Sequence, residues 1–235
     1  MTTETSHHPS GPLALAVALG AVAGFVDAYL YRGVTPVFVA NMSGNLVHLG
    51  IFAGEGSWPP AIGSCLALLA FLAGVVSATV HHDRQVVSGA EVGPRRLLGL
   101  EAVLVLALPL LLVVLDVRYV TTTTPRQYPV LLLGGFAMGI QTAALRRVGE
   151  VAVATTYGTG AIVRIGEKLA LGARRADRAG NHRRRVTIGV LVAVLTSYVA
   201  GAAIAAWAGS SRWLLLVPAA VLAVAATATT ESVDA

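Results

Sequence analysis

Long apolar runs alternate with short polar intervals along the whole chain. Eight apolar segments can be read from the sequence: 12–31, 37–54, 61–80, 97–117, 129–145, 151–172, 187–208 and 213–230. A helix that crosses a bilayer needs about 20 mostly apolar residues, and most of these segments are near that length. The pattern therefore predicts an all-α integral membrane protein.

The second and sixth segments, 37–54 and 151–172, differ from the other six. They are rich in Gly, Ser, Thr and Asn, and each follows a very short connection. Non-helical backbone is tolerated at membrane depth only where protein or a water-filled cavity satisfies its polar groups. We therefore expect six transmembrane helices plus two re-entrant or broken segments.

The two unusual segments also resemble each other, which predicts an internal duplication. Residues 43–50 (SGNLVHLG) match residues 159–166 (TGAIVRIG) at an offset of 116. Upstream, paired glycines repeat at an offset of 115: Gly20 with Gly135, and Gly24 with Gly139. Two adjacent matching runs indicate a repeat of four segments used twice, with repeat 1 at about 12–117 and repeat 2 at about 129–230.

The distribution of Lys and Arg favours the six-helix topology, because these residues concentrate in short cytoplasmic loops. If all eight segments cross, the two sides carry ten and seven basic residues. If the second and sixth segments dip in and return, the split is thirteen against four, and the four are Arg32, Arg118, Arg126 and Arg212. Both termini then face the cytoplasm of a bacterial inner membrane. Three crossings per repeat make the repeats inverted, whereas eight crossings would make them parallel.

Composition adds little beyond this class. Only 12% of the 235 residues are charged, 55% are hydrophobic, and the net charge is +5, with a mean hydropathy of +0.72. A single domain is expected at 12–230, with a disordered tail at 1–11 and a short C-terminal tail at 231–235. We interpret the positive net charge as a determinant of orientation in the membrane and not as a sign of nucleic-acid binding. Cys65 is the only cysteine, so no intrachain disulfide can form.

Asp27 is the most informative single residue. It lies in GFVDAY near the outer end of the first helix, and membrane-embedded carboxylates are costly and commonly functional. The alternative is a structural hydrogen bond to the neighbouring broken segment, for example with Asn41 or Asn45. We favour the functional interpretation.

A pathway for a small solute or ion is the first functional hypothesis. Short polar side chains and glycines suit such a lining, although small residues also serve helix packing. The expected centre of the pathway is a meeting of Ser43-Gly44 with Thr159-Gly160 near the bilayer middle. The candidate residues are Asp27, Asn41, Ser43, Gly44, Asn45, His48, Gln141, Thr156, Thr159, Gly160 and Arg164.

Other chemistry is not indicated by the sequence. No phosphate-binding loop, nucleophile elbow or zinc-protease motif is present, so we expect no enzyme activity, no cofactor and no metal. The expected partners are the lipid bilayer and a small solute or ion. A homo-oligomer could form through the glycine-rich helix faces.

Four stretches together resemble a known family. GFVDAY at 24–29, VFVANMSGNLVHLG at 37–50, MGIQTAALRR at 138–147 and TTYGTGAIVRIG at 155–166 are similar to the YoaK-type family of bacterial membrane proteins, over roughly 12 to 230. The resemblance implies an inner-membrane protein of several helices and supplies no substrate. A transporter or channel is our own inference from architecture; the alternative is a membrane scaffold or an intramembrane enzyme.

Overall fold

The chain forms a bundle of helices in which every predicted apolar segment is represented. A computed structural model describes residues 10–89, 94–117, 123–145, 147–148, 151–152, 158–172 and 178–231. The helices are α1 Ser10–Gly33, α2 Met42–Gly54, α3 Trp58–Val87, α4 Arg95–Val114, α5 Tyr128–Ala144, α6 Gly158–Gly172, α7 Arg178–Ala208 and α8 Leu216–Glu231. Short 3-10 turns, Pro125–Gln127 and Arg212–Leu215, precede α5 and α8, and two-residue strands β1 (Arg147–Val148) and β2 (Val151–Ala152) form a small hairpin. The all-helical membrane class is confirmed.

The second predicted segment begins with a non-helical stretch. The segment expected at 37–54 is helical only from Met42. In the segment expected at 151–172, the structure describes β2 at Val151–Ala152 and α6 at Gly158–Gly172, and residues 153–157 lie outside the described part. Both resulting helices are short, with 13 and 15 residues, whereas the helices that follow them, α3 and α7, have 30 and 31. The long helices therefore form the main bundle, and the short helices α2 and α6 pack against α3 and α7.

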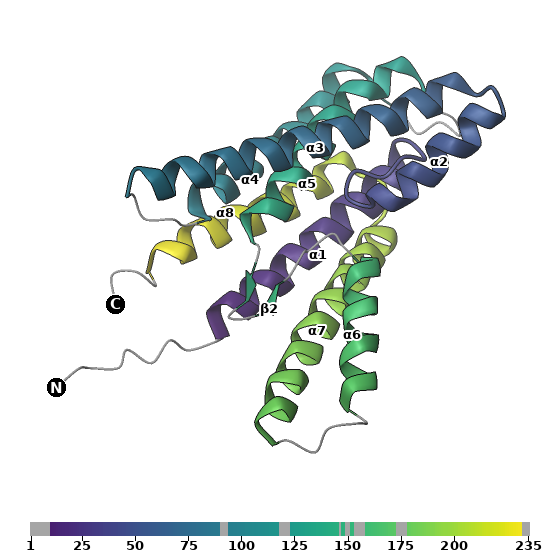
Figure 1. The fold of residues 1–235 in the computed structure, drawn as a ribbon. Coiled ribbons are helices and arrows are strands. Elements are labelled where there is room, and N and C mark those ends of the chain that lie inside the picture. Colours follow the sequence, from purple (N-terminus) through teal and green to yellow (C-terminus); the bar gives the residue numbers. More distant parts are fainter. Residues whose placement is uncertain are drawn as a thin grey trace.

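The helices pair across the two halves of the chain. α1 packs along α7, and α3 packs along α5. α4 contacts both α5 and α8, while α2 lies on α3 and α6 lies on α7 (Figure 1). The first and third helices of each half thus find their main partners in the other half.

Glycines allow the backbones of the two main pairs to approach closely. A Cβ atom on Gly24 of α1 would lie 1.9 Å from the carbonyl oxygen of Tyr198 on α7. A Cβ atom on Gly139 of α5 would lie 2.2 Å from the carbonyl oxygen of Phe71 on α3. Because only glycine fits such contacts, these faces are already occupied inside the chain. Any homo-oligomer would have to use other surfaces.

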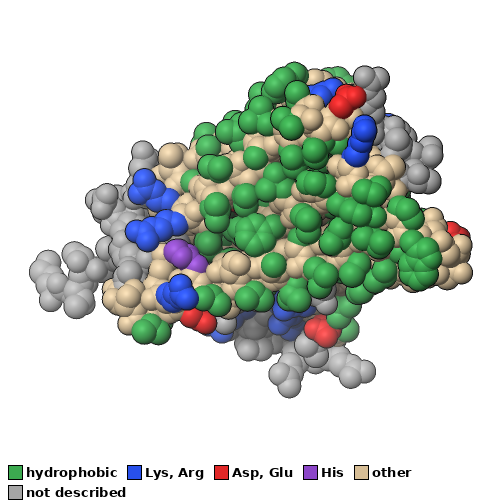
Figure 2. All heavy atoms as spheres, turned by 90° about the horizontal axis from the view of Figure 1, so that it is seen from above, with side chains coloured by type: hydrophobic (Ala, Val, Ile, Leu, Met, Phe, Trp, Pro, Cys, Tyr) green, Lys and Arg blue, Asp and Glu red, His purple; other side chains and the backbone are tan. Residues whose placement is uncertain are grey.

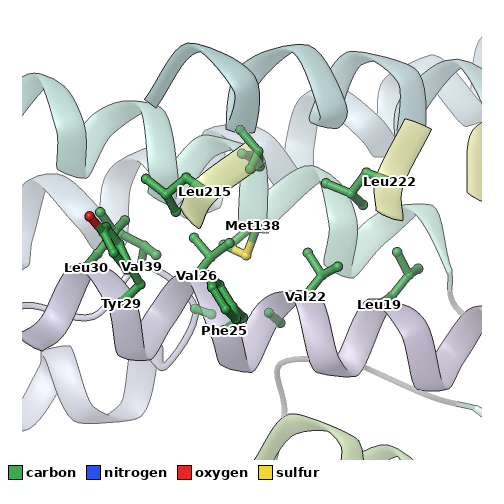
Figure 3. Packing of buried hydrophobic residues seen from close by; sticks show 14 of the residues in the cluster. Leu19, Val22, Phe25, Val26, Tyr29, Leu30, Val39, Met138, Leu215 and Leu222 are labelled. Carbon is green, nitrogen blue, oxygen red and sulfur yellow. The ribbon is translucent and has the colours of Figure 1, made fainter. Parts of the chain in front are cut away.

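The core lies along α1, where it meets α5 and α8. Figure 3 shows Val22 and Val26 of α1 facing Met138 of α5. On the same side lie Leu215, at the end of the 3-10 turn before α8, and Leu222 of α8. All five side chains are buried, with exposures of 0–2%. This apolar packing holds α1 at the centre and so fixes the position of the break that follows it.

The outer surface matches a lipid environment. Five helices, α1, α3, α4, α7 and the last one, are long and apolar enough to cross a membrane, and α5 is shorter, with 17 residues. Large apolar side chains point outward from α3 and α4, among them Leu69, Leu72, Val103 and Leu110, each at least 45% exposed. In Figure 2 such side chains cover a broad central area, with charged side chains at its margins. The protein is a multi-pass membrane protein.

Candidate functional site

The chain breaks its helical course directly after α1 and folds back along it. Residues 34–41 form a non-helical connection, and Val39 and Ala40 lie beside Asp27, which is six residues before the last residue of α1. At a rise of 1.5 Å per residue, this is about 9 Å back from the end of the helix. α2 then begins at Met42, at this inner level.

The N–H groups of residues 34, 35 and 37–40 in this connection are accepted by groups of the protein. Val34 and Thr35 donate to the carbonyl of Leu30, and Val37 donates to the carbonyl of Thr35. Residue 36 is a proline and has no N–H group. The next three N–H groups are accepted by side chains: Phe38 by Asn45, and Val39 and Ala40 by Asp27. Buried backbone without such partners would be costly, so these side chains make the break permissible.

Asp27 joins three parts of the fold. Its Oδ1 atom accepts the backbone N–H groups of Val39 and Ala40 at 2.7 and 2.8 Å. Its Oδ2 atom accepts the hydroxyl of Tyr198 on α7 at 2.6 Å. The side chain is 2% exposed. The structural bond to the neighbouring segment that the sequence left open is therefore present, although its partners are backbone groups and not the amides of Asn41 or Asn45.

The polar residues of the NMSGN stretch also serve the local backbone. Asn41 caps α2: its Oδ1 accepts the N–H of Gly44 at 3.2 Å and the hydroxyl of Ser43 at 2.9 Å. Asn45 is fully buried and pairs with the backbone of Phe38 through both ends of its amide, at 3.0 and 2.7 Å. Gly44 leaves no room for a side chain, because a Cβ atom would lie 2.9 Å from the Phe38 ring.

His48 belongs to an aromatic cluster and not to a chain of polar groups. Its ring stacks on Phe38, with centroids 5.6 Å apart, and lies 6.2 Å from Tyr31 and 5.5 Å from Phe52. Tyr31 and Phe38 stack on each other at 4.3 Å. This cluster clamps the broken connection between the end of α1 and the middle of α2.

The candidates from the second half are dispersed. Gln141 is fully buried on α5 and donates to the backbone carbonyl of Leu19 on α1 at 2.9 Å. Thr159 and Arg164 of α6 are exposed, and Gly160 is half-buried. Thr156 lies outside the described residues.

The two matching motifs are held by different helices. The α2 motif packs on α3 and the α6 motif on α7, and both Ser43 and Thr159 are exposed. That they share one polar site stays a prediction.

Several residues that matter here were not singled out from the sequence. Tyr198 completes the Asp27 site, and Gln127 donates to the Val34 carbonyl at 2.8 Å. The hydroxyls of Thr35 and Thr123 are 2.7 Å apart and fully buried. These residues hold the connection from outside, across large sequence separations. A polar residue in a long apolar helix was the available signal for Tyr198, but it did not reveal the partner.

The arrangement holds a non-helical connection in place through hydrogen bonds from buried side chains. No cluster of three or more His, Cys, Asp or Glu side chains suited to a metal occurs in the part of the chain that is described. What the site offers is a buried carboxylate that bridges a non-helical connection and a neighbouring helix.

Comparisons with known proteins agree with this architecture. The family described as "Protein of unknown function (DUF1275)" matches residues 15–228. The chain belongs to the DUF1275 family. A curated relative, the UPF0700 transmembrane protein YoaK of Bacillus subtilis (strain 168), is 29% identical over 147 residues, which cover 63% of this chain and 62% of that protein. No solved structure matches. The DUF1275 match runs from within α1 to within α8, so the Asp27 site lies inside it.

Proposed function

We propose that the protein is a transporter or channel for a small solute or ion in the bacterial cytoplasmic membrane. The observation that carries the proposal is the broken connection at 34–41, which runs back into the bundle to Asp27 before α2 leads out again. Discontinuous helices that begin inside the membrane are the recurring sites of solute and ion binding in transporters.

The position where α6 starts also supports the proposal. The first residue of α6, Gly158, lies against Leu195 near the middle of α7. α6 therefore also begins at mid-bundle, beside the long helix of its own half, as α2 does beside α3. In the proposed topology, each of these two segments enters the membrane from one face and returns to the same face.

We infer that the two halves are inverted repeats, because their helix contacts correspond residue by residue. Positions in α1 and α5 are related by an offset of 115, and positions in α3 and α7 by an offset of 127. Gly24 meets the carbonyl of Tyr198, and its counterpart Gly139 meets the carbonyl of Phe71. In the reverse direction Gly201 meets the carbonyl of Ala21 at 2.0 Å, and Gly74 meets that of Phe136 at 2.2 Å.

The other helix pairs follow the same exchange. α2 on α3 corresponds to α6 on α7, α4 on α5 corresponds to α8 on α1, and α4 pairs with its own counterpart α8. Such mutual exchange is what a two-fold axis between the halves produces. With the charge split that favours three crossings per half, the axis lies in the membrane plane, which is the inverted arrangement of many transporters.

The repeat breaks its symmetry at Asp27, which favours a pathway on that side. The counterparts of Asp27 and Tyr198 are Thr142 and Phe71. Thr142 donates to the carbonyl of Met138 on its own helix, so no acid–phenol pair occurs there. Since the shared scaffold folds without the carboxylate in the second half, we propose that Asp27 and Tyr198 form the moving contact between the broken segment and α7.

The orientation follows from the same features. Both termini, the α3–α4 connection and the α6–α7 connection are proposed to face the cytoplasm. The opposite end carries all three tryptophans, Trp58, Trp207 and Trp213, which are 52–89% exposed. Tryptophan at the level of the headgroups is typical of a membrane interface.

Flux into liposomes tests the proposal directly. Purified protein is reconstituted and screened against a panel of alkali cations, chloride, amino acids and small sugars, with empty liposomes as the reference. We expect flux of at least one class that falls in Tyr198→Phe, which keeps the ring and removes the bond to Asp27. Absence of flux above empty liposomes across the panel would favour a scaffold role.

A further inference from the structure

A carboxyl group without a protein partner lies in the core, on α4. Glu101 is fully buried, with an exposure of 0%. Neither of its carboxyl oxygens has a hydrogen-bond partner among the described residues. This differs from Asp27, which is equally enclosed but makes three hydrogen bonds.

The carboxyl lies on the face of α4 that packs against α5. Leu97, one turn earlier, packs with Ile140 and Ala143 of α5, and Leu104, one turn later, contacts the same cluster. Residues three and four apart lie on one side of a helix, so Glu101 is enclosed between these two contacts. The position is an apolar helix interface inside the membrane domain.

Among the described residues of the neighbouring elements, charged groups that could compensate an ionised Glu101 are few and lie away from it. α5 contains no Asp, Glu, Lys, Arg or His. In α8 only the last residue, Glu231, is charged, and Arg212 of the preceding turn binds a carbonyl at the opposite end of α4. Arg95 and Arg96 on α4 itself are exposed.

The last turns of α3 carry the titratable or charged side chains His81, His82, Asp83 and Arg84. α3 reaches α4 through Ala78, and one turn beyond it lies His81. His81 is half-buried and its ring nitrogen is 3.1 Å from the amide of Gln85. It is therefore engaged within its own helix.

Packing alone does not call for an acid at this position. α4 and α8 correspond at an offset of 117: Leu98 matches Leu215 and Val105 matches Leu222, and all four are fully buried. The counterpart of Glu101 is then Pro218, which is buried as well. An apolar residue fills the equivalent place in the second half, so the carboxyl in the first half points to a chemical role.

An ionised carboxylate enclosed by apolar groups with no partner is far more costly than a protonated one. We propose that Glu101 is a proton-binding site, neutral in this conformation, and that its release and uptake of a proton couples to solute movement. The binding step is a carboxylate and a proton giving a carboxylic acid, with no other reactant. The coupling role rests on the transport function proposed above; the proton site itself does not.

Infrared spectroscopy of the lipid-reconstituted protein tests the proton site without any solute. We expect a protonated-carboxyl stretching band at neutral pH that is lost in Glu101→Gln and kept in Glu167→Gln, a matched change at an exposed position of α6. Glu101→Gln imitates the protonated acid in shape, so the variant should fold. A spectrum at neutral pH without a band that depends on Glu101 overturns the proposal.

Proton uptake by liposomes that contain a pH-sensitive dye tests the coupling. The solute panel defined above is added to vesicles with wild type, Glu101→Gln or Glu167→Gln. We expect solute-dependent proton uptake in wild type and Glu167→Gln and none in Glu101→Gln. Solute flux with unchanged proton uptake in Glu101→Gln refutes the coupling, whereas absence of all solute flux in wild type refutes the transport function and leaves the infrared result to decide the proton site.

Discussion

The hydroxyl of Tyr198 donates a 2.6 Å hydrogen bond to the carboxylate of Asp27, 171 positions earlier in the chain. The same carboxylate accepts two backbone N–H groups of the connection that leads to α2. One side chain therefore ties the first helix, the first broken segment and the seventh helix together. Any movement of α7 against α1 at this level must stretch or break the Tyr198 bond.

Substitutions at Asp27 and Tyr198 distinguish the contribution of this pair to stability from its contribution to function. A hydrogen bond to a charged group contributes about 1.5–3 kcal/mol, so Tyr198→Phe should lower the free energy of unfolding by about that amount. Asp27→Asn keeps an acceptor for the two backbone groups and should cost a similar amount, whereas Asp27→Leu leaves both N–H groups unsatisfied and should cost more. Thermal unfolding in detergent measures each change.

A double-mutant cycle supplies the control for this prediction. Asp27→Asn combined with Tyr198→Phe should destabilise less than the sum of the single changes, because both remove the same bond. If Asp27→Asn unfolds the protein as badly as Gly44→Leu, which forces a large side chain against the Phe38 ring, Asp27 is a purely structural residue.

Asn45 should matter far more for folding than Ser43. Asn45→Leu leaves the N–H and C=O groups of Phe38 without their partners inside the protein, and each buried unsatisfied group costs about 1–3 kcal/mol. Ser43 is exposed and its hydroxyl donates to Asn41, so Ser43→Ala should change stability by no more than about 0.5 kcal/mol. Comparable losses of melting temperature in the two variants would contradict the role of Asn45 as the partner of the Phe38 backbone.

The repeat predicts matched effects at glycines that correspond. Gly24→Ala and Gly139→Ala each push a methyl group into a backbone carbonyl of the partner helix, which should cost about 1–3 kcal/mol or more. Gly50 and Gly166, also a corresponding pair, have nothing within 4 Å of a new Cβ atom. Alanine there should be neutral or stabilising by up to about 1 kcal/mol, because it is the better helix former. Unequal losses within the first pair would argue against equivalent packing of the two halves.

Cysteine labelling tests the proposed topology. With Cys65 replaced by Ala, Glu55→Cys and Ser210→Cys should react with a membrane-impermeant reagent added outside the cell, and His82→Cys should react only after the membrane is opened. All three positions are at least partly exposed. If Glu55→Cys is protected from the outside reagent and accessible from the cytoplasm, α2 crosses the membrane and eight crossings replace six.

The apolar pattern was sufficient to locate the helices, since each predicted segment overlaps one helix, and the described non-helical stretch at 34–41 reaches into the second segment, which is rich in small polar residues. Asp27 was also identified from the sequence, because a carboxylate in an apolar run is conspicuous. Its partner Tyr198 was not, since a tyrosine in a long apolar helix gives no local indication of what its hydroxyl meets. Glu101 was not singled out from the sequence, because it lies close to the start of its helix and only the packing of α4 on α5 encloses it.

The exchange of helices between the two halves has a consequence for biosynthesis. The contact of Gly24 on α1 with Tyr198 on α7 can form only after α7 has been synthesised. At about 5–20 residues per second, the ribosome needs roughly 10–35 s to add the residues between them. During that time Asp27 and the glycine face of α1 lack the helix that covers them, and α3 likewise waits for α5. The first half is thus expected to depend on the insertion machinery, or on a membrane chaperone, until the second half has been delivered.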